Sequence, residues 1–313
     1  MKLGYFLSCE EYGPRELLDQ ARRAEEAGFH ALWISDHYHP WNDEQGHSPF
    51  VWSVVAALAQ VTRLPVTTAV TCPTVRIHPA VIAQAAATSA ILHEGRFALG
   101  VGTGEALNEH ILGDRWPEAA VRREQLEEAV EILRLLWQGG QRSHRGRYYT
   151  VENARVYDLP DEPPPVLVSG FGPQAIDLAA RIGDGLVTVQ PDAEGIARYR
   201  EGGGRGPVQT GTKVCYGPDA DAARETAYRL WRNEGLGGEL AQILPTPAHF
   251  EQACETVRPD DLVTPVGPDL DAHAESLQQY ADAGADELFV QQIGPDHDAF
   301  FAEWAPAMLQ RFS

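Results

Sequence analysis

The sequence predicts an α/β fold, a (β/α)8 TIM barrel formed as a single domain by residues 1–313. One observation is a repeated module in which an amphipathic helix ends at a glycine and an apolar strand follows, as at Gly28, Gly183 and Gly284. Glycine suits this position because the residue that closes a helix often takes the left-handed conformation. A second observation is that the strands are apolar throughout, which is typical of parallel sheets covered on both faces.

Eight such strands alternate with helices, which favours a closed barrel over a doubly wound open sheet. The predicted strands are Leu3–Leu7, Ala31–Ile34, Pro65–Val70, Phe97–Val101, Val166–Ser169, Gly185–Val189, Thr212–Tyr216 and Glu287–Val290. The clearest helices between them are Pro14–Ala27, Pro79–Leu92, Arg122–Trp137, Pro173–Ile182 and Ala220–Asn233. Three of these helices begin with proline, which is favoured in the first turn.

Two segments are longer than the module requires. Residues 139–165 follow the fourth strand and its helix, and residues 234–268 follow the seventh strand and its helix. We predict that both segments are insertions over the mouth or the flank of the barrel. The glycine-rich run at residues 202–206 leads into a strand and does not open a helix. It is therefore predicted to be a flexible loop and not a phosphate-binding motif.

Composition restricts the partners. The chain has 25 Lys and Arg against 45 Asp and Glu, and a net charge of −20 disfavours nucleic acid and anionic membrane surfaces. Its only lysines are Lys2 and Lys213. No run approaches the roughly 18 apolar residues of a membrane helix. The four cysteines are widely spaced, which is typical of reduced thiols, so we expect a cytoplasmic protein with a small-molecule substrate.

Asp36 and His37 directly follow the second predicted strand, where barrel enzymes carry their chemistry. Histidine exchanges protons near neutral pH, so His37 suits a general base, and Trp41 offers a flat face to a ring or a positive charge. His37 and His39 also have the spacing of a metal-binding pair. Because Pro40 ends the strand and no further ligand set is evident, we predict no metal.

Glu105 follows the fourth strand at the end of the run Gly102-Thr103-Gly104. Burial at a barrel mouth would raise the pKa of this carboxyl group, so that it could donate a proton at neutral pH. Glu109, one helical turn later, is equally consistent with a solvated or capping charge.

A third candidate site is the turn Ser169-Gly170-Phe171-Gly172-Pro173 after the fifth strand. Small residues, free amides and the start of a helix together favour an anion. The turn is therefore expected to hold a phosphate-bearing cofactor, with a plain strand-to-helix turn as the alternative.

Three stretches together resemble the luciferase-like flavin and deazaflavin oxidoreductases: residues 36–41, 102–109 and 73–84. The branch that they resemble most is that of the coenzyme F420-dependent glucose-6-phosphate dehydrogenases. The resemblance implies a luciferase-like barrel with F420 in its mouth, an F420-dependent oxidoreductase activity and a homodimer. An FMN-dependent oxidoreductase or monooxygenase on the same scaffold is the alternative.

The resemblance also implies roles for individual residues. His37 would take the proton of a substrate alcohol, Trp41 would stabilise that intermediate, and Glu105 would protonate the ring. We expect His37 and Glu105 to converge on opposite margins of one flat ring. The implied cofactor contacts are Asp36, Asn108, Thr103 and Gly104 at the ring and Ser169, Gly170, Phe171 and Gly172 at the phosphate, with a non-proline cis peptide at Ala69-Val70.

The substrate is expected to differ from that of the sugar-phosphate enzymes, which use basic residues, lysines among them, to hold a phosphate. The loop at residues 190–194 offers no cation, and neither Lys2 nor Lys213 is expected to help. We therefore predict hydride transfer between F420 and a small alcohol or carbonyl compound that is not a sugar phosphate.

Overall fold

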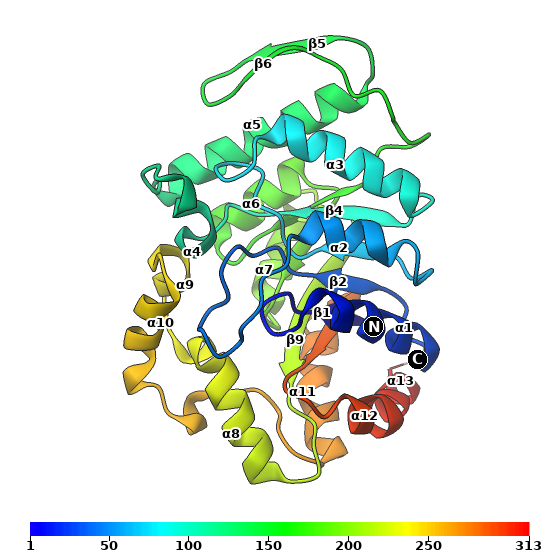
Figure 1. Ribbon diagram of the computed structural model, residues 1–313, viewed down its shortest axis with the longest axis vertical. Helices are drawn as coiled ribbons and strands as arrows, with labels where there is room; N and C mark the ends of the chain where they lie inside the picture. Colours follow the sequence, from blue (N-terminus) through cyan, green and yellow to red (C-terminus); the bar gives the residue numbers. More distant parts are fainter. Residues whose placement is uncertain (313) are drawn as a thin grey trace.

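The computed structural model describes residues 1–312 and contains a closed barrel of eight parallel strands (Figure 1). The strands, in spatial order around the barrel, are β1 (Lys2–Leu7), β2 (Leu32–Ile34), β3 (Val66–Thr68), β4 (Phe97–Val101), β7 (Val166–Ser169), β8 (Gly185–Thr188), β9 (Val208–Val214) and β10 (Glu287–Gln292). β1 pairs with both β2 and β10, which closes the sheet. The predicted TIM barrel is confirmed.

Helices surround this barrel and cover the outer face of the sheet (Figure 1). They are α1 (Pro14–Ala27), α2 (Val51–Leu58), α3 (Pro79–Leu92), α4 (Ala106–Glu109), α5 (Ala119–Trp137), α6 (Pro173–Ile182), α7 (Ala193–Glu201), α8 (Ala220–Trp231), α9 (Leu240–Ile243), α10 (Pro247–Ala253), α11 (Leu270–Asp282), α12 (His297–Ala299) and α13 (Ala305–Arg311). Four short 3-10 helices lie between them, η1 (His110–Leu112), η2 (Arg232–Gly235), η3 (Cys254–Thr256) and η4 (Pro259–Asp261), and a π-helical segment, η5 (Phe300–Trp304), precedes α13. No helix within residues 1–312 is long and apolar enough to cross a membrane.

The barrel is filled by aromatic side chains. Trp33 stacks on Phe289 with ring centroids 4.6 Å apart, and its Nε1 donates to Oε1 of Gln209 at 2.8 Å. A Cβ at Gly211 would lie 2.5 Å from the Trp33 ring, so this position has no room for a side chain. The floor below the mouth is therefore a packed layer of side chains, as in other barrels of this type.

Some predicted boundaries were wrong. The seventh strand was expected at residues 212–216, but β9 begins at Val208 and ends at Val214. Its first half includes Gln209, Thr210 and Gly211, whose polar or small side chains conceal a strand that is nevertheless buried inside the barrel. The third strand is shorter than predicted, because it ends at Thr68, just before the cis peptide Ala69-Val70.

The two insertions take different positions. Residues 139–165 form an antiparallel hairpin of β5 (Arg142–Arg145) and β6 (Thr150–Ala154), which extends beyond α5 (Figure 1). Residues 234–268 contain α9 and α10, and α9 packs against α4 at the mouth. The four cysteines are all unpaired and buried, which confirms the prediction of reduced thiols.

Candidate active site

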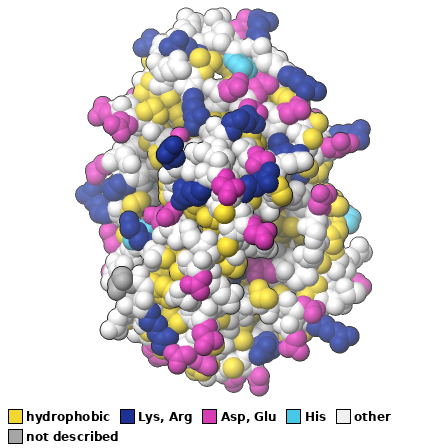
Figure 2. Space-filling model, turned by 180° about the vertical axis from the view of Figure 1, so that it is seen from behind, with side chains coloured by type: hydrophobic (Ala, Val, Ile, Leu, Met, Phe, Trp, Pro, Cys, Tyr) yellow, Lys and Arg dark blue, Asp and Glu magenta, His cyan; other side chains and the backbone are white. Residues whose placement is uncertain are grey.

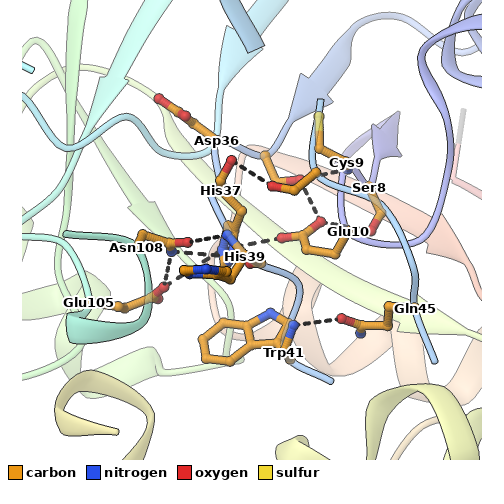
Figure 3. Close-up of polar contacts among 12 residues, drawn as sticks. Ser8, Cys9, Glu10, Asp36, His37, His39, Trp41, Gln45, Glu105 and Asn108 are labelled. Carbon is orange, nitrogen blue, oxygen red and sulfur yellow. Dashed lines mark hydrogen bonds and ion pairs between the residues drawn. The ribbon is translucent and has the colours of Figure 1, made fainter. Parts of the chain in front are cut away.

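His37 lies at the mouth of the barrel, in the loop after β2, with 11% of its side chain exposed. Its Nε2 atom is 3.2 Å from Oε1 of Glu10 and 3.6 Å from Oε2 of Glu105 (Figure 3). Its Nδ1 atom is 3.1 Å from the carbonyl oxygen of His39 and 3.2 Å from Nδ2 of Asn108. In the tautomer that donates Nδ1–H to the His39 carbonyl, the lone pair of Nε2 remains free to accept a proton.

Glu10 is a buried carboxylate that the sequence analysis missed. Its Oε2 atom accepts hydrogen bonds from the hydroxyl groups of Ser8 at 2.8 Å and Ser35 at 2.7 Å. Burial opposes ionisation of Glu10, but His37 and the two hydroxyl groups outweigh it and lower its pKa below the usual value. The signal was present in the sequence, because Glu10 follows the first strand as Asp36 follows the second.

Glu105 stands at the N-terminal boundary of α4, and its side chain is partly exposed. Burial and the nearby Glu10 raise its pKa, although His37 and the hydrogen bond from Asn108 lower it, so the predicted direction is confirmed. The gap of 3.6 Å between the Glu105 and His37 side chains leaves no width for a ring. The two groups therefore lie on the same side of the barrel mouth. Our expectation that they lie on opposite margins of one ring was wrong.

Asn108 is buried in α4, and its side chain connects this helix to the loop after β2. Its Oδ1 atom accepts hydrogen bonds from the backbone amides of Tyr38 at 2.8 Å and His39 at 3.2 Å. Its Nδ2 atom donates to Oε2 of Glu105 at 3.1 Å. In this structure Asn108 holds the His37 loop against Glu105, and its contact with a cofactor stays a prediction.

Trp41 forms one wall beside the imidazole. Its ring centroid lies 5.1 Å from that of His37 and 5.0 Å from that of Phe250 on α10, which meets it edge-on. Its backbone amide donates to Oε1 of Gln45 at 2.8 Å (Figure 3). The second insertion thus supports the aromatic wall of the site.

Asp36 points away from His37, toward a separate buried ion-pair cluster (Figure 3). Its two carboxylate oxygens accept hydrogen bonds from Arg76 at 2.8 Å and Thr71 at 2.8 Å, and its side chain has no exposed area. The predicted contact of Asp36 with a ring therefore stays a prediction, and it would require the side chain to become accessible.

Glu109 belongs to the same cluster, so the alternative of a solvated charge is excluded. Its side chain is 1% exposed and accepts from the backbone amide of Arg76 at 2.6 Å and from the guanidinium group at 3.4 Å. Burial nevertheless raises the pKa of Glu109 to about 7, because it outweighs the opposing effect of Arg76. The cluster ties together the loops after β2, β3 and β4.

The remaining predicted cofactor residues form a surface lined by small groups. A Cβ at Gly102 would lie 2.7 Å from Val70 and 3.5 Å from Ser169, so the ends of three strands converge there. Gly104 has a φ of +76° and packs against Cys72, with Thr103 between these two glycines. The cis peptide Ala69-Val70 is present as predicted.

The turn before α6 is open to a ligand. A Cβ built on Gly172 would have no neighbour within 4 Å, and Phe171 is 54% exposed. At Gly170, in contrast, a Cβ would lie 3.0 Å from the backbone nitrogen of Ile176, so the chain approaches the helix closely. A flat ring over the small residues and an anionic group at the start of α6 fit these surroundings.

The imidazoles of His37 and His39, which have the sequence spacing of a metal-binding pair, contact different partners. Nδ1 of His39 lies 2.8 Å from the carbonyl oxygen of Leu107, and its ring stacks on that of His110. Within residues 1–312 no three His, Cys, Asp or Glu side chains are grouped as metal ligands.

The structure corrects the expectation for one lysine. Lys2 starts β1 at the opposite end of the barrel, but Lys213 is the penultimate residue of β9 and so lies at the mouth. Its ammonium group pairs with Glu234 and lies 4.2 Å from the ring centroid of Trp231. Its position was mispredicted because the strand begins at Val208, four residues before the predicted start at Thr212.

A family model described as luciferase-like monooxygenase matches residues 1–287. The chain belongs to this family. The luciferase-like chain is 36% identical to a protein of Microbacterium testaceum named F420-dependent glucose-6-phosphate dehydrogenase, with 99% of this chain and 97% of the relative covered. It is 38% identical to the F420-dependent hydroxymycolic acid dehydrogenase of Mycobacterium tuberculosis, with coverages of 90% and 81%.

A solved structure agrees with these relatives. The luciferase-like chain superposes with a TM-score of 0.90 on an F420-dependent secondary alcohol dehydrogenase in complex with an F420-acetone adduct. The two share 30% sequence identity, and the match covers 98% of each chain. The resemblance inferred from the sequence is thereby confirmed.

Proposed function

We propose that this luciferase-like protein is an F420-dependent oxidoreductase that interconverts a small neutral alcohol and its carbonyl compound. The observation that carries this proposal is that Nε2 of His37 faces two carboxyl groups at the barrel mouth, one with a lowered and one with a raised pKa. The names of the relatives at 30% identity or more support F420 and do not favour the FMN alternative.

Bound F420 would supply the carbon that accepts hydride from the alcohol carbon. The hydroxyl proton of the substrate passes to Nε2 of His37, and the carbonyl product forms as the C–H and O–H bonds break. In the tautomer that carries its hydrogen on Nδ1, His37 donates to the His39 carbonyl and presents the lone pair of Nε2. Proton uptake then places an imidazolium 3.2 Å from ionised Glu10, where the opposite charges stabilise each other.

Glu105 performs a different task because its surroundings differ from those of Glu10. Its raised pKa lets it hold a proton closer to neutrality, and the amide of Asn108 orients it. It is the proton donor beside the cofactor, while Glu10 remains the counter-charge of His37. The two carboxyl groups, whose pKa values are shifted in opposite directions, thus take the separate roles of counter-charge and proton donor.

The charges around the mouth favour a neutral substrate over a phosphate. Glu10, Glu105 and Glu234 contribute carboxyl groups, and Lys213 is already paired with Glu234. A phosphate bound at this lysine would therefore lie beside the Glu234 carboxylate, which would repel it.

The face shown in Figure 2 mixes Lys and Arg with Asp and Glu, so its described residues form no continuous basic surface for nucleic acid. A homodimer and a cytoplasmic location stay predictions.

The test is to titrate the purified protein with F420 and with FMN, following fluorescence, and then to supply 2-propanol or glucose 6-phosphate. We expect F420 to bind more tightly than FMN and 2-propanol to bleach the oxidised deazaflavin. Preferred binding of FMN with oxygen consumption would contradict the cofactor assignment. Faster turnover of glucose 6-phosphate would contradict the substrate class.

A further inference from the structure

A second polar group lies in the mouth and takes no part in the steps above. Lys213 leaves β9 on the inner face of the barrel, because Gly211, two residues earlier, faces the Trp33 ring. The lysine side chain therefore projects one layer above the aromatic floor. Its partners are in the segment that follows β9, with Trp231 at the end of α8 and Glu234 in η2.

The ammonium group of Lys213 has N–H donors that remain available to a ligand. Within residues 1–312 its only hydrogen-bond acceptor is Glu234, and an ammonium group carries three N–H donors. The side chains of Lys213 and Glu234 are 17% and 29% exposed, so neither is sealed in the core. The Trp231 ring stabilises the cation and holds it in place.

Gln291 supplies an unused acceptor beside this donor. It pairs with Lys213 in the register of β9 and β10, so both side chains leave the sheet on the same inner face. Gln291 is fully buried, and its Nε2 donates to Oε2 of Glu11 at 3.1 Å. Its Oε1 atom has no hydrogen-bond partner within the described residues. Buried polar atoms normally find a partner, so this carbonyl oxygen indicates a ligand donor.

Lys213 and Gln291 are linked to the reacting end of the site through Glu11 and the two tryptophans. Glu11, which binds both Gln291 and the indole nitrogen of Trp231, directly follows Glu10 in the chain. Trp41 packs against the apolar cluster that contains Trp231. A single small molecule with one end at His37 would therefore extend along the tryptophan wall toward Lys213.

We propose that Lys213 and Gln291 bind a second hydroxyl group of the substrate, which makes the preferred substrate a neutral diol or polyol; this rests on the proposed function. A hydroxyl group can accept from Lys213 and donate to Oε1 of Gln291 at the same time. A carboxylate or phosphate would satisfy the lysine but would face the Gln291 carbonyl and the carboxylates of Glu11 and Glu234. A ketone or ether oxygen would leave Gln291 unpaired.

The kinetic test compares 1,2-propanediol with 2-propanol in Lys213→Met, with Lys2→Met as the matched control at the far end of the barrel. We expect Lys213→Met to raise KM for the diol at least about tenfold, as the loss of a charge-assisted hydrogen bond predicts, with little change in kcat. KM for 2-propanol should be unchanged, and Lys2→Met should resemble the wild type. Equal effects on both alcohols, or no effect on either, would overturn the proposal.

A binding test without cofactor separates this subsite from the proposed function. Xylitol, a neutral polyol, should change the tryptophan emission of the wild type, because Trp231 lies against Lys213. The change should be lost in Lys213→Met and in Gln291→Met. If xylitol binds but no alcohol is oxidised, the proposed function fails and the subsite stands. If xylitol has no effect on the wild type, the subsite fails.

Discussion

Oε1 of Glu10 lies 3.2 Å from Nε2 of His37, although the two residues follow different strands. The carboxylate is fixed on its other side by the hydroxyl groups of Ser8 and Ser35. A buried, ionised carboxylate stabilises the protonated imidazole far more than an exposed one would, because little water screens the pair. In the proposed mechanism, the positive charge that His37 acquires from the substrate proton therefore meets a counter-charge that is already in place.

Replacing His37, the proposed general base, should strongly lower turnover and leave cofactor binding intact. We expect His37→Ala to lower kcat by about 10²–10⁴-fold, the usual contribution of a positioned general base. F420 affinity, measured by fluorescence titration, should remain close to that of the wild type. His144→Ala is the matched control, because this histidine lies in the β5–β6 hairpin, where it contacts Glu128. A loss of affinity as large as the loss of turnover would show that His37 binds the cofactor.

Glu10→Gln should keep the shape of the site and remove its counter-charge. We expect turnover to fall by about 10- to 100-fold, because a hydrogen bond to a charged group contributes about 1.5–3 kcal/mol. The lowered pKa of Glu10 also contributes stability above its ordinary value of 4.5, which is lost as the pH falls through the lower folded value. Urea unfolding between pH 3 and 7 should therefore show less acid destabilisation in the variant. Unchanged turnover would remove Glu10 from the mechanism.

Glu109 should make stability fall as pH rises. Its pKa is raised from 4.5 to about 7 in the folded protein, so the folded state binds more protons than the unfolded state between these values. Stability should therefore decrease from pH about 4.5 to 7, by about 3 kcal/mol at most, and level off above that. Glu109→Gln removes this titration, so its unfolding free energy should vary less between pH 5 and 8. A steeper dependence in the variant would contradict this cause.

Gly172→Asp should separate helix stability from cofactor binding. Aspartate is a favoured residue at the N-cap of a helix, and a Cβ at Gly172 meets no atom within 4 Å, so the melting temperature should hold or rise. The added negative charge should weaken F420 binding at least about tenfold, because it competes for the positive end of α6. Gly237→Ala, at another open position, is the control. Unaltered F420 affinity would place the anionic group elsewhere.

Residues that directly follow a predicted strand were correctly predicted to form the site, because parallel strands bring their carboxyl ends to one edge of the sheet. It predicted that His37, Trp41 and Glu105 would be neighbours, and the contacts of His37 with the other two show that they are. The same rule applied to Glu10 but was not used there, because the adjacent carboxylates Glu10 and Glu11 have no histidine beside them in the sequence. Lys213 was misplaced for a different reason, because polar inner-face residues concealed the start of β9.

Apolar runs and helix-closing glycines are local properties, so the chain by itself determined the barrel and the end that carries chemistry. The family was inferred from the resemblance of three short stretches to known members. Distances between side chains on different loops are not local. Only the folded structure decided that Asp36 joins Arg76 and Glu109, that His37 meets Glu10, and that Lys213 faces the mouth. The physical reason is that buried charges take the partners that tertiary packing brings within about 4 Å, and sequence spacing does not encode that choice.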